Sequence, residues 1–233
     1  MAQPLHPSIS RVAGVARALG ELSGDVVFIG GAIAPLLQSN PVMPQVRPTD
    51  DVDALVASTS YGSHGAMEDK MRALGFKTES SDLKHVHRWR TPDGTPFDLV
   101  PAGEHLGGTG GVWDRAALDT AVKTQLEPGL VIRHASATGF LALKWAAFWD
   151  RGAGDPFRSE DLEDILALLV SRDSIVLEFH AAPRDVQEHI RKGLNWLKRS
   201  NDYADLVAAF LGSAAAFSHA AALLRERIAE MLS

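Results

Sequence analysis

Cysteine is absent from all 233 residues of the chain, which excludes disulfide bonds and thiolate metal sites and makes a reducing compartment the simplest expectation. No apolar run approaches the roughly 20 residues that a helix needs to cross a bilayer. The first residues, Met1 to His6, lack the basic-then-apolar pattern of a secretory signal peptide. We therefore expect a cytoplasmic protein with no membrane-spanning segment.

Positive charge is also scarce. The chain has 23 Lys and Arg residues against 29 Asp and Glu residues, and its formal net charge is -6. Overall charge therefore does not steer the protein onto nucleic acid, and a polyanionic partner would need a local basic patch. Hydrophobic residues make up 45% of the chain, which is enough for a sizeable core in one or two domains.

The hydrophobic pattern changes near residue 135. Before this point, runs typical of strands occur at residues 26–29, 52–57, 76–79, 85–91, 95–100, 118–123 and 130–133, with helical spacing at 8–22, 32–38 and 64–74. Beyond it, helical spacing occurs at residues 137–150, 159–171, 184–199, 201–212 and 214–231, whereas 174–180 is ambiguous. Gly193 argues against an unbroken helix over 184–199. We expect an α/β domain over residues 1–135 and a helical domain over residues 136–233.

Two acids two residues apart, Asp51 and Asp53, lie in the segment Arg47–Val56. Side chains alternate along a strand, so these carboxylates are expected on one face. Neighbouring carboxylates repel each other unless a cation lies between them, and a divalent cation is the usual one. Acidic clusters are more often solvated turns, but the apolar neighbours of this pair and an upstream glycine pair favour a metal site.

That glycine pair, Gly30–Gly31, follows the apolar run Val26–Ile29. Glycine allows backbone N–H groups to approach an anion closely at the start of the next helix. A third acid, Asp98, lies in the apolar segment Phe97–Val100, where a core strand would avoid a charge without a purpose; an edge-strand surface position is the alternative. A phosphate-binding turn and metal-binding acids are the groups that phosphoryl or nucleotidyl transfer requires.

The helical half carries further charged candidates. Lys144 lies in an apolar helical segment, from which it either reaches a phosphate or extends to solvent. Asp161 and Asp164 are three residues apart and share a helical face. Their position after Ser159 is also typical of a helix N-terminus, which favours acids whatever their function.

Taken in order, the motifs of residues 24–170 resemble the nucleotidyltransferase superfamily, which has the polymerase-β-like fold. Its glycine turn, its R-x-[ST]-x-D-x-D strand and its later acid are matched by Gly30 and Gly31, by Arg47, Thr49, Asp51 and Asp53, and by Asp98.

The helical half is similar to the K-x-x-A-x-x-x-R and D-x-x-D helices of the AbiEii/AbiGii-type nucleotidyltransferases. These are the toxins of type IV toxin–antitoxin and abortive-infection systems. Lys144, Ala147 and Arg151 fit the first pattern, and Asp161 and Asp164 fit the second.

The resemblance implies a mixed-sheet nucleotidyltransferase domain followed by a helical domain. It implies two Mg²⁺ ions held by Asp51, Asp53 and Asp98, and an NTP bound by Gly30, Gly31, Arg47, Thr49 and Lys144, with Asp161 or Asp164 orienting the lysine or the nucleotide. The implied reaction transfers a nucleoside monophosphate from the NTP to an acceptor hydroxyl and releases pyrophosphate. The implied acceptor is the 3′ end of tRNA or another RNA, and the implied role is a toxin with a cognate antitoxin.

Two other functions fit the same residues: an adenylyltransferase acting on a small molecule or a protein, and a non-catalytic nucleotide-binding module. Three segments also have two readings each. His85 and His87, with His134 as a further candidate, have zinc-compatible side chains and the first two share one strand face, or these histidines line a cleft or pair with the sheet surface. Gly103–Gly111 forms a phosphate loop or a connector. The basic residues of 184–199 follow an RNA backbone or form a solvated face.

Overall fold

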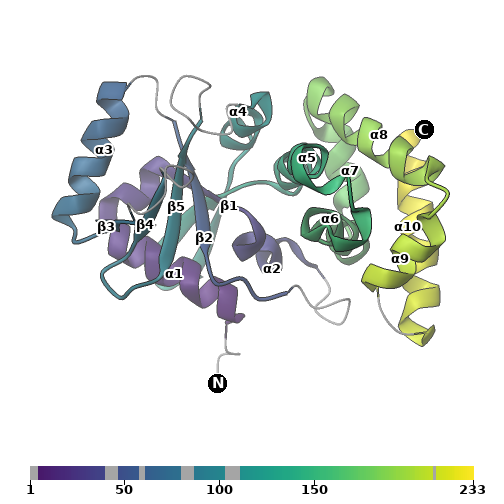
Figure 1. The fold of residues 1–233 in the computed structure, drawn as a ribbon, viewed down its shortest axis with the longest axis horizontal. Helices are drawn as coiled ribbons and strands as arrows, with labels where there is room; N and C mark the ends of the chain where they lie inside the picture. The colour runs from purple at the N-terminus through teal and green to yellow at the C-terminus, as the bar shows by residue number, and fades with distance from the viewer. Residues whose placement is uncertain (1–4, 40–46, 58–60, 80–86, 103–110, 212–213) are drawn as a thin grey trace. The chain divides into compact units, whose positions relative to one another are not determined.

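The computed structural model describes residues 5–39, 47–57, 61–79, 87–102, 111–211 and 214–233. The chain forms two compact units (Figure 1). The first contains the residues up to Leu36 and Arg47–Ser136, and the second contains Ala137–Ser233 with a short stretch that begins at Leu37. No helix within the described ranges is both long and apolar enough to span a bilayer.

The first unit is built on a seven-stranded sheet in the order β3-β4-β5-β2-β1-β7-β6. Its strands are β1 (Val26–Ile29), β2 (Val52–Val56), β3 (Lys77–Thr78), β4 (Arg88–Arg90), β5 (Pro96–Pro101), β6 (Val122–Glu127) and β7 (Leu130–His134). β2 runs parallel to β5, and β1 runs parallel to β7, whereas the other neighbouring strands are antiparallel. The sheet is therefore mixed, which confirms the α/β class expected from the sequence.

Within the described residues, four helices accompany this sheet: α1 (Pro7–Leu19), α2 (Ala34–Leu37), α3 (Tyr61–Ala73) and α4 (Val112–Asp119). α1 buries the apolar face that the sequence spacing predicted and contacts β2 and β7. β1 consists only of Val, Phe and Ile and is almost wholly buried, as is typical of a central strand covered on both faces. A strand made only of apolar residues is expected in the interior of the sheet, because only an interior strand covered on both faces removes all of its side chains from water.

The expected strand over residues 118–123 is wrong. α4 continues to Asp119, Thr120 donates its hydroxyl to the carbonyl of Ala116 (2.8 Å), and β6 begins only at Val122. β6 lies at the edge of the sheet, and its residues are exposed or half-buried. An edge strand that buries few side chains does not require alternating apolar and polar residues. The first residue of such a strand therefore cannot be located from the hydrophobic pattern.

The second unit is helical. It contains α5 (Ala137–Ala147), the π-helical turn η4 (Phe148–Gly152), the short η5 (Pro156–Arg158), α6 (Glu160–Ser171), α7 (Ile175–Ala181), α8 (Arg184–Arg199), α9 (Tyr203–Leu211) and α10 (Ala214–Leu232). The ambiguous residues 174–180 thus belong mostly to a helix, α7. α5 packs against α6, α7 and α8, and α10 packs against α6 to α9.

Gly193 does not interrupt α8. A Cβ atom at this position would lie 2.2 Å from Cδ2 of Trp145, a fully buried side chain of α5. Gly193 is therefore a point of close helix contact, where a side chain would collide with the indole ring.

Replacing Gly193 with Ala is expected to lower the free energy of unfolding by a net value of about 1–2 kcal/mol, because a clash with a fully buried indole falls at the upper end of the range of about 1–3 kcal/mol that overpacking costs. Alanine's better helix propensity, worth about 1 kcal/mol, opposes this effect without cancelling it. Urea unfolding followed by circular dichroism measures the change. Gly14→Ala in α1 is the matched control, because nothing lies within 4 Å of a Cβ there, and it should stabilise the protein. Equal stabilisation by both substitutions would contradict the tight packing inferred at Gly193.

Candidate functional site

The three acids singled out in the sequence lie together in the first unit. Asp53 is the second residue of β2 and lies directly opposite Asp98 of β5 in the parallel pairing. Asp51 immediately precedes β2 and lies two residues before Asp53. One carboxylate oxygen from each acid lies within 4.8 Å of the others. Strand alternation and cross-strand register therefore bring the three carboxylates into one cluster, which we call the acidic triad.

Thr49 holds the first acid of the triad in place. Its hydroxyl donates a 2.5 Å hydrogen bond to Oδ1 of Asp51. The backbone around Thr49 is fixed to α1, because Arg11 donates to its carbonyl (2.8 Å) and Ser8 accepts from its N–H (3.3 Å). Arg47, the other residue predicted to bind nucleotide from this segment, is exposed.

Gly30 makes room for the second acid. It has a φ of +73°, and a Cβ atom here would lie 2.2 Å from Oδ2 of Asp53. Any other residue would thus push the Asp53 carboxylate away and adopt a strained backbone conformation. The sequence assigned Gly30 to the approach of a phosphate, whereas the structure adds a second reason for glycine: the close approach of Asp53. Gly31 begins the 3₁₀ turn η2 (Gly31–Ile33).

Arg88 is the residue of this site that the sequence reasoning missed. It lies on β4 opposite Asp98, and its guanidinium donates to both oxygens of that carboxylate, at 2.8 and 2.7 Å. Its Nη2 also lies 3.5 Å from Oδ2 of Asp51. The hydrogen bond to Asp98 is the main reason that the pKa of Arg88 is raised above its ordinary value. The sequence does not reveal this role, because only the cross-strand register of β4 and β5 places Arg88 opposite Asp98.

The acidic triad has the composition of a divalent cation site. Carboxylate oxygens are hard ligands of the kind that Mg²⁺, Ca²⁺ and Mn²⁺ prefer. Gly30 keeps the Asp53 carboxylate in the cluster, where a Cβ would displace it. Arg88 neutralises part of the negative charge, so an incoming cation must share Asp98 with the guanidinium or displace it.

Replacing Arg88 with Gln is expected to tighten divalent cation binding by about tenfold, because it removes a competing positive charge worth about 1–2 kcal/mol at this distance. Titration with Mn²⁺, followed by calorimetry and by the electron paramagnetic resonance of free Mn²⁺, measures the change. Arg90→Gln is the matched control: Arg90 lies on the same strand but pairs with Glu79 (2.6 Å). An affinity that falls in Arg88→Gln and stays constant in Arg90→Gln would show instead that Arg88 supports the cation site.

The charged candidates of the second unit form a separate cluster between α5 and α6. Nζ of Lys144 lies 3.0 Å from Asp161 and 2.5 Å from Asp164. Arg151 in η4 donates to both oxygens of Asp161, at 2.8 and 3.0 Å. Ser159 begins α6 by accepting a hydrogen bond from the N–H of Leu162 (3.2 Å), as its capping pattern predicted.

Burial and ion pairing act in opposite directions on this cluster. Burial alone would lower the pKa of Lys144, but the charges of Asp164 and Asp161 outweigh it and raise the pKa above its usual value. Burial would likewise raise the pKa of Asp161, but the hydrogen bond from Arg151 and the charge of Lys144 hold it below its usual value. Lys144 and Asp161 therefore stay charged at neutral pH, and the Lys144 ammonium contacts the carboxylates of both Asp161 and Asp164.

Other sequence candidates are not part of a metal cluster in the described residues. His87 packs edge-on against the ring of His64, at 5.9 Å between centroids. His134 is buried and hydrogen-bonded to Thr124 (2.8 Å) and to the carbonyl of Ala135 (2.9 Å). His85, the other half of the proposed zinc pair, and the glycines at 103, 107, 108 and 110 lie outside the described residues.

One comparison with known proteins, that with solved structures, supports the fold. No family model matches the chain, and no curated protein matches its sequence. Among solved structures, the chain is similar to an antigenic nucleotidyltransferase-like protein from Paracoccidioides brasiliensis, with 19% identity, a TM-score of 0.52 and coverage of 91% of this chain and 97% of that one. A looser likeness, with 13% identity and a TM-score of 0.47, covers 86% of this chain and 96% of the antibiotic-resistance factor ANT(2'')-Ia. At such identity the first match speaks for the fold alone: the chain has a nucleotidyltransferase-like fold that carries an acidic triad.

Proposed function

We propose that the protein is a nucleotidyltransferase that moves a nucleoside monophosphate from an NTP to an acceptor hydroxyl and releases pyrophosphate. The observation that carries this proposal is the convergence of Asp51, Asp53 and Asp98 at β2 and β5 of a nucleotidyltransferase-like fold. In the reaction, a bond forms between the acceptor oxygen and the α-phosphorus. The bond from that phosphorus to the β-phosphate oxygen breaks, and the acceptor hydroxyl loses its proton.

The three triad carboxylates would hold two Mg²⁺ ions. When bound, such ions lower the pKa of an attacking hydroxyl and neutralise the charge of a triphosphate. Thr49 keeps Asp51 in orientation through its hydrogen bond, and Gly30 keeps Asp53 in the cluster. The backbone at Gly30–Gly31 and the exposed Arg47 are our candidates for holding the phosphates of the NTP.

We assign Lys144 to phosphate binding, with Asp161 and Asp164 as the acids that orient it. The ion pairs of Lys144 with both acids support the orienting part of this assignment. The sequence leaves open whether Asp161 or Asp164 orients the lysine. Because Lys144 pairs with both, we assign this role to the two acids together. Arg151, the last residue of the K-x-x-A-x-x-x-R pattern, completes the cluster through Asp161.

The acceptor in our proposal is RNA, most specifically the 3′ end of tRNA, and the biological role is that of a toxin held in check by an antitoxin. This part rests on the similarity of residues 144–151 and 161–164 to the AbiEii/AbiGii-type motifs. Incubation with each labelled NTP, Mg²⁺ and total RNA tests it directly. Label in tRNA supports the full proposal. Label only in protein or in a small molecule would refute the RNA acceptor, and absence of any pyrophosphate release would refute the transferase.

A further inference from the structure

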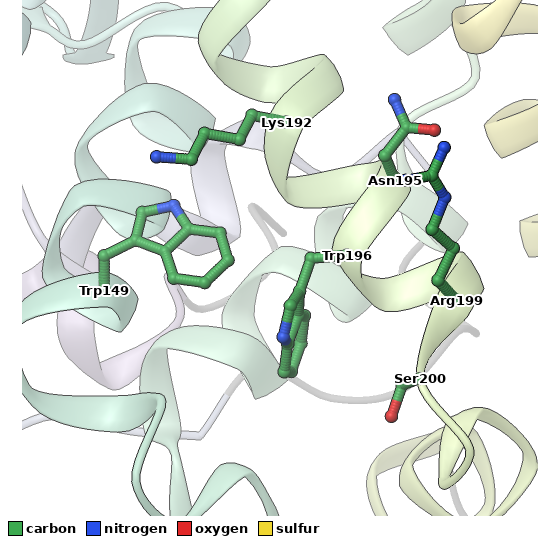
Figure 2. A pocket seen from close by; sticks show the side chains of 6 residues that line it. All are labelled: Trp149, Lys192, Asn195, Trp196, Arg199 and Ser200. Carbon is green, nitrogen blue, oxygen red and sulfur yellow. The ribbon is translucent and has the colours of Figure 1, made fainter.

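The second unit contains a pocket of about 480 Å³ beside α8 and η4. It is lined by two tryptophans, two cations and two uncharged polar residues: Trp149, Trp196, Lys192, Arg199, Asn195 and Ser200 (Figure 2). Trp149 comes from η4, and the others come from α8 and the residue that follows it. Neither the acidic triad nor the cluster around Lys144 contributes to this pocket.

Trp149 and Trp196 form the aromatic wall of the pocket, and buried aromatic side chains support it. Trp149 and Trp196 lie 5.7 Å apart in an edge-to-face arrangement, and both are only partly buried. Behind them, the fully buried Trp145 and Phe148 contact both rings at centroid distances of 4.8 to 6.5 Å. The exposed parts of the two rings therefore form a fixed apolar surface, and a flat ligand can stack on it without first ordering the site.

Both charged residues that line the pocket, Lys192 and Arg199, are positive. Nζ of Lys192 lies 5.4 Å from the ring centroid of Trp149, and Figure 2 shows the nitrogen-bearing edge of that ring turned toward the lysine. The buried indole N–H of Trp149 has no acceptor in the described part of the chain. Lys192 and Arg199 are exposed and form no ion pair with any described residue. Residues 191–199 contain four cations and no acid, in a chain whose net charge is -6.

We propose that this pocket binds one unpaired nucleotide within a nucleic-acid strand. The base stacks on the exposed tryptophan surface, and the phosphates on either side of it contact Lys192 and Arg199. These cations are seven residues apart on α8, about 10 Å along the helix axis. A free nucleotide carries its phosphates at one end, whereas a nucleotide inside a strand has one phosphate on each side. Stacking aromatics and flanking cations are the means by which proteins hold single strands.

This inference deepens the proposed function, because it places part of the acceptor strand on the helical unit. Only the role of the strand as the acceptor rests on the proposed function; the binding of the strand does not. The test measures binding alone. A labelled single strand of about 10 nucleotides is titrated with the full-length protein, without NTP or divalent cation, and followed by fluorescence anisotropy. RNA and DNA strands of the same sequence are compared, and their relative affinity identifies the natural ligand.

Replacing Lys192 and Arg199 together with Gln is expected to weaken strand binding at least tenfold. It should also reduce the salt dependence, the slope of log K against log salt, by about 1.4, because each single-strand phosphate contact contributes about 0.7. Trp196→Ala should weaken binding by roughly tenfold, through lost stacking. Lys198→Gln is the matched control: Lys198 is exposed on the same helix but does not line the pocket. It should change the affinity by less than about twofold.

Weaker binding of a duplex of the same sequence would support the proposal. Equal affinity for a mononucleotide, or an equal loss in Lys198→Gln and in the paired variant, would overturn it. The same titration with Asp53→Asn protein separates this inference from the proposed function. Strand binding without any transfer by the unaltered protein would refute only the transferase. Transfer to a small molecule by a protein that binds no strand would refute the pocket assignment and the RNA acceptor and leave the transferase standing.

Discussion

Replacing Asp53 with Asn is expected to reduce nucleotide transfer by about 10³-fold or more. A metal clamp on transferring phosphates is worth several kcal/mol, and each 1.36 kcal/mol is tenfold in rate. Asp53 lies opposite Asp98 in the sheet and in contact with Gly30, so it occupies the centre of the acidic triad. Asparagine has the same shape as aspartate, so the packing against Gly30 should survive while the charge is lost. Release of pyrophosphate from labelled NTP measures the effect, and calorimetric Mn²⁺ titration should show weaker binding in parallel.

Asp50→Asn is the matched control for this prediction. Asp50 is only three residues away, but its side chain is 93% exposed and pairs with Arg11 at the surface. Transfer by this variant should stay within about twofold of the unaltered protein, because a surface ion pair contributes little. Circular dichroism establishes that each variant is folded. Nucleotide transfer at the unaltered rate by both Asp51→Asn and Asp53→Asn would contradict a role of the acidic triad in the reaction.

Replacing Asp161 with Ala is expected to lower the free energy of unfolding by about 3–5 kcal/mol, the usual cost of removing one partner from a buried ion pair. The Asp161 side chain is 4% exposed and accepts hydrogen bonds from Lys144 and Arg151. The Lys144 side chain is 12% exposed, so the variant would keep a buried ammonium with Asp164 as its remaining partner. Arg151 is 67% exposed and can turn to water. Urea unfolding measures the loss.

Asp119→Ala provides the comparison, because Asp119 pairs with Arg115 on the surface of α4, with both side chains more than 60% exposed. Its loss should cost less than about 1 kcal/mol. The pH dependence gives a second readout. The pKa of Asp161 is below the value of 3.8 for an unpaired carboxyl, so its stabilisation is complete above that pH and is lost as the pH falls through the lowered pKa. Asp161→Ala should therefore flatten the loss of stability in acid; an unchanged acid profile would contradict the ion pairing.

Much of the fold was predictable because local pattern and burial agreed. The run Val26–Ile29 is apolar throughout and forms the interior strand β1 with the predicted bounds. The spacing of Asp51 and Asp53, and an acid within an apolar run at Asp98, predicted the triad because strand alternation is a local property. β6 escaped prediction since an edge strand that buries little carries no regular pattern.

What sequence alone did not predict depends on register and on close approach between elements. Arg88 and Asp98 are ten residues apart, and only the pairing of β4 with β5 places them opposite each other. Gly30 reads as a phosphate turn, yet its contact with Asp53 follows from the pairing of β1 with β2. Gly193 reads as a helix breaker until Trp145 of α5 is seen against it. In each case the missing information was the identity of a neighbour distant in sequence.

The bidentate contact between Arg88 and Asp98 has a consequence for how the protein is made. The carboxylates of an acidic cluster repel one another when no cation lies among them. Some small metal-binding domains fold only once their metal ion binds, because the binding free energy drives folding. Here the chain supplies its own cation to the triad, at 2.7 and 2.8 Å from Asp98. We therefore expect the newly synthesised first unit to fold before any metal ion is acquired. Cellular divalent ion levels would then control how much of the protein is active and leave unchanged how much of it is folded.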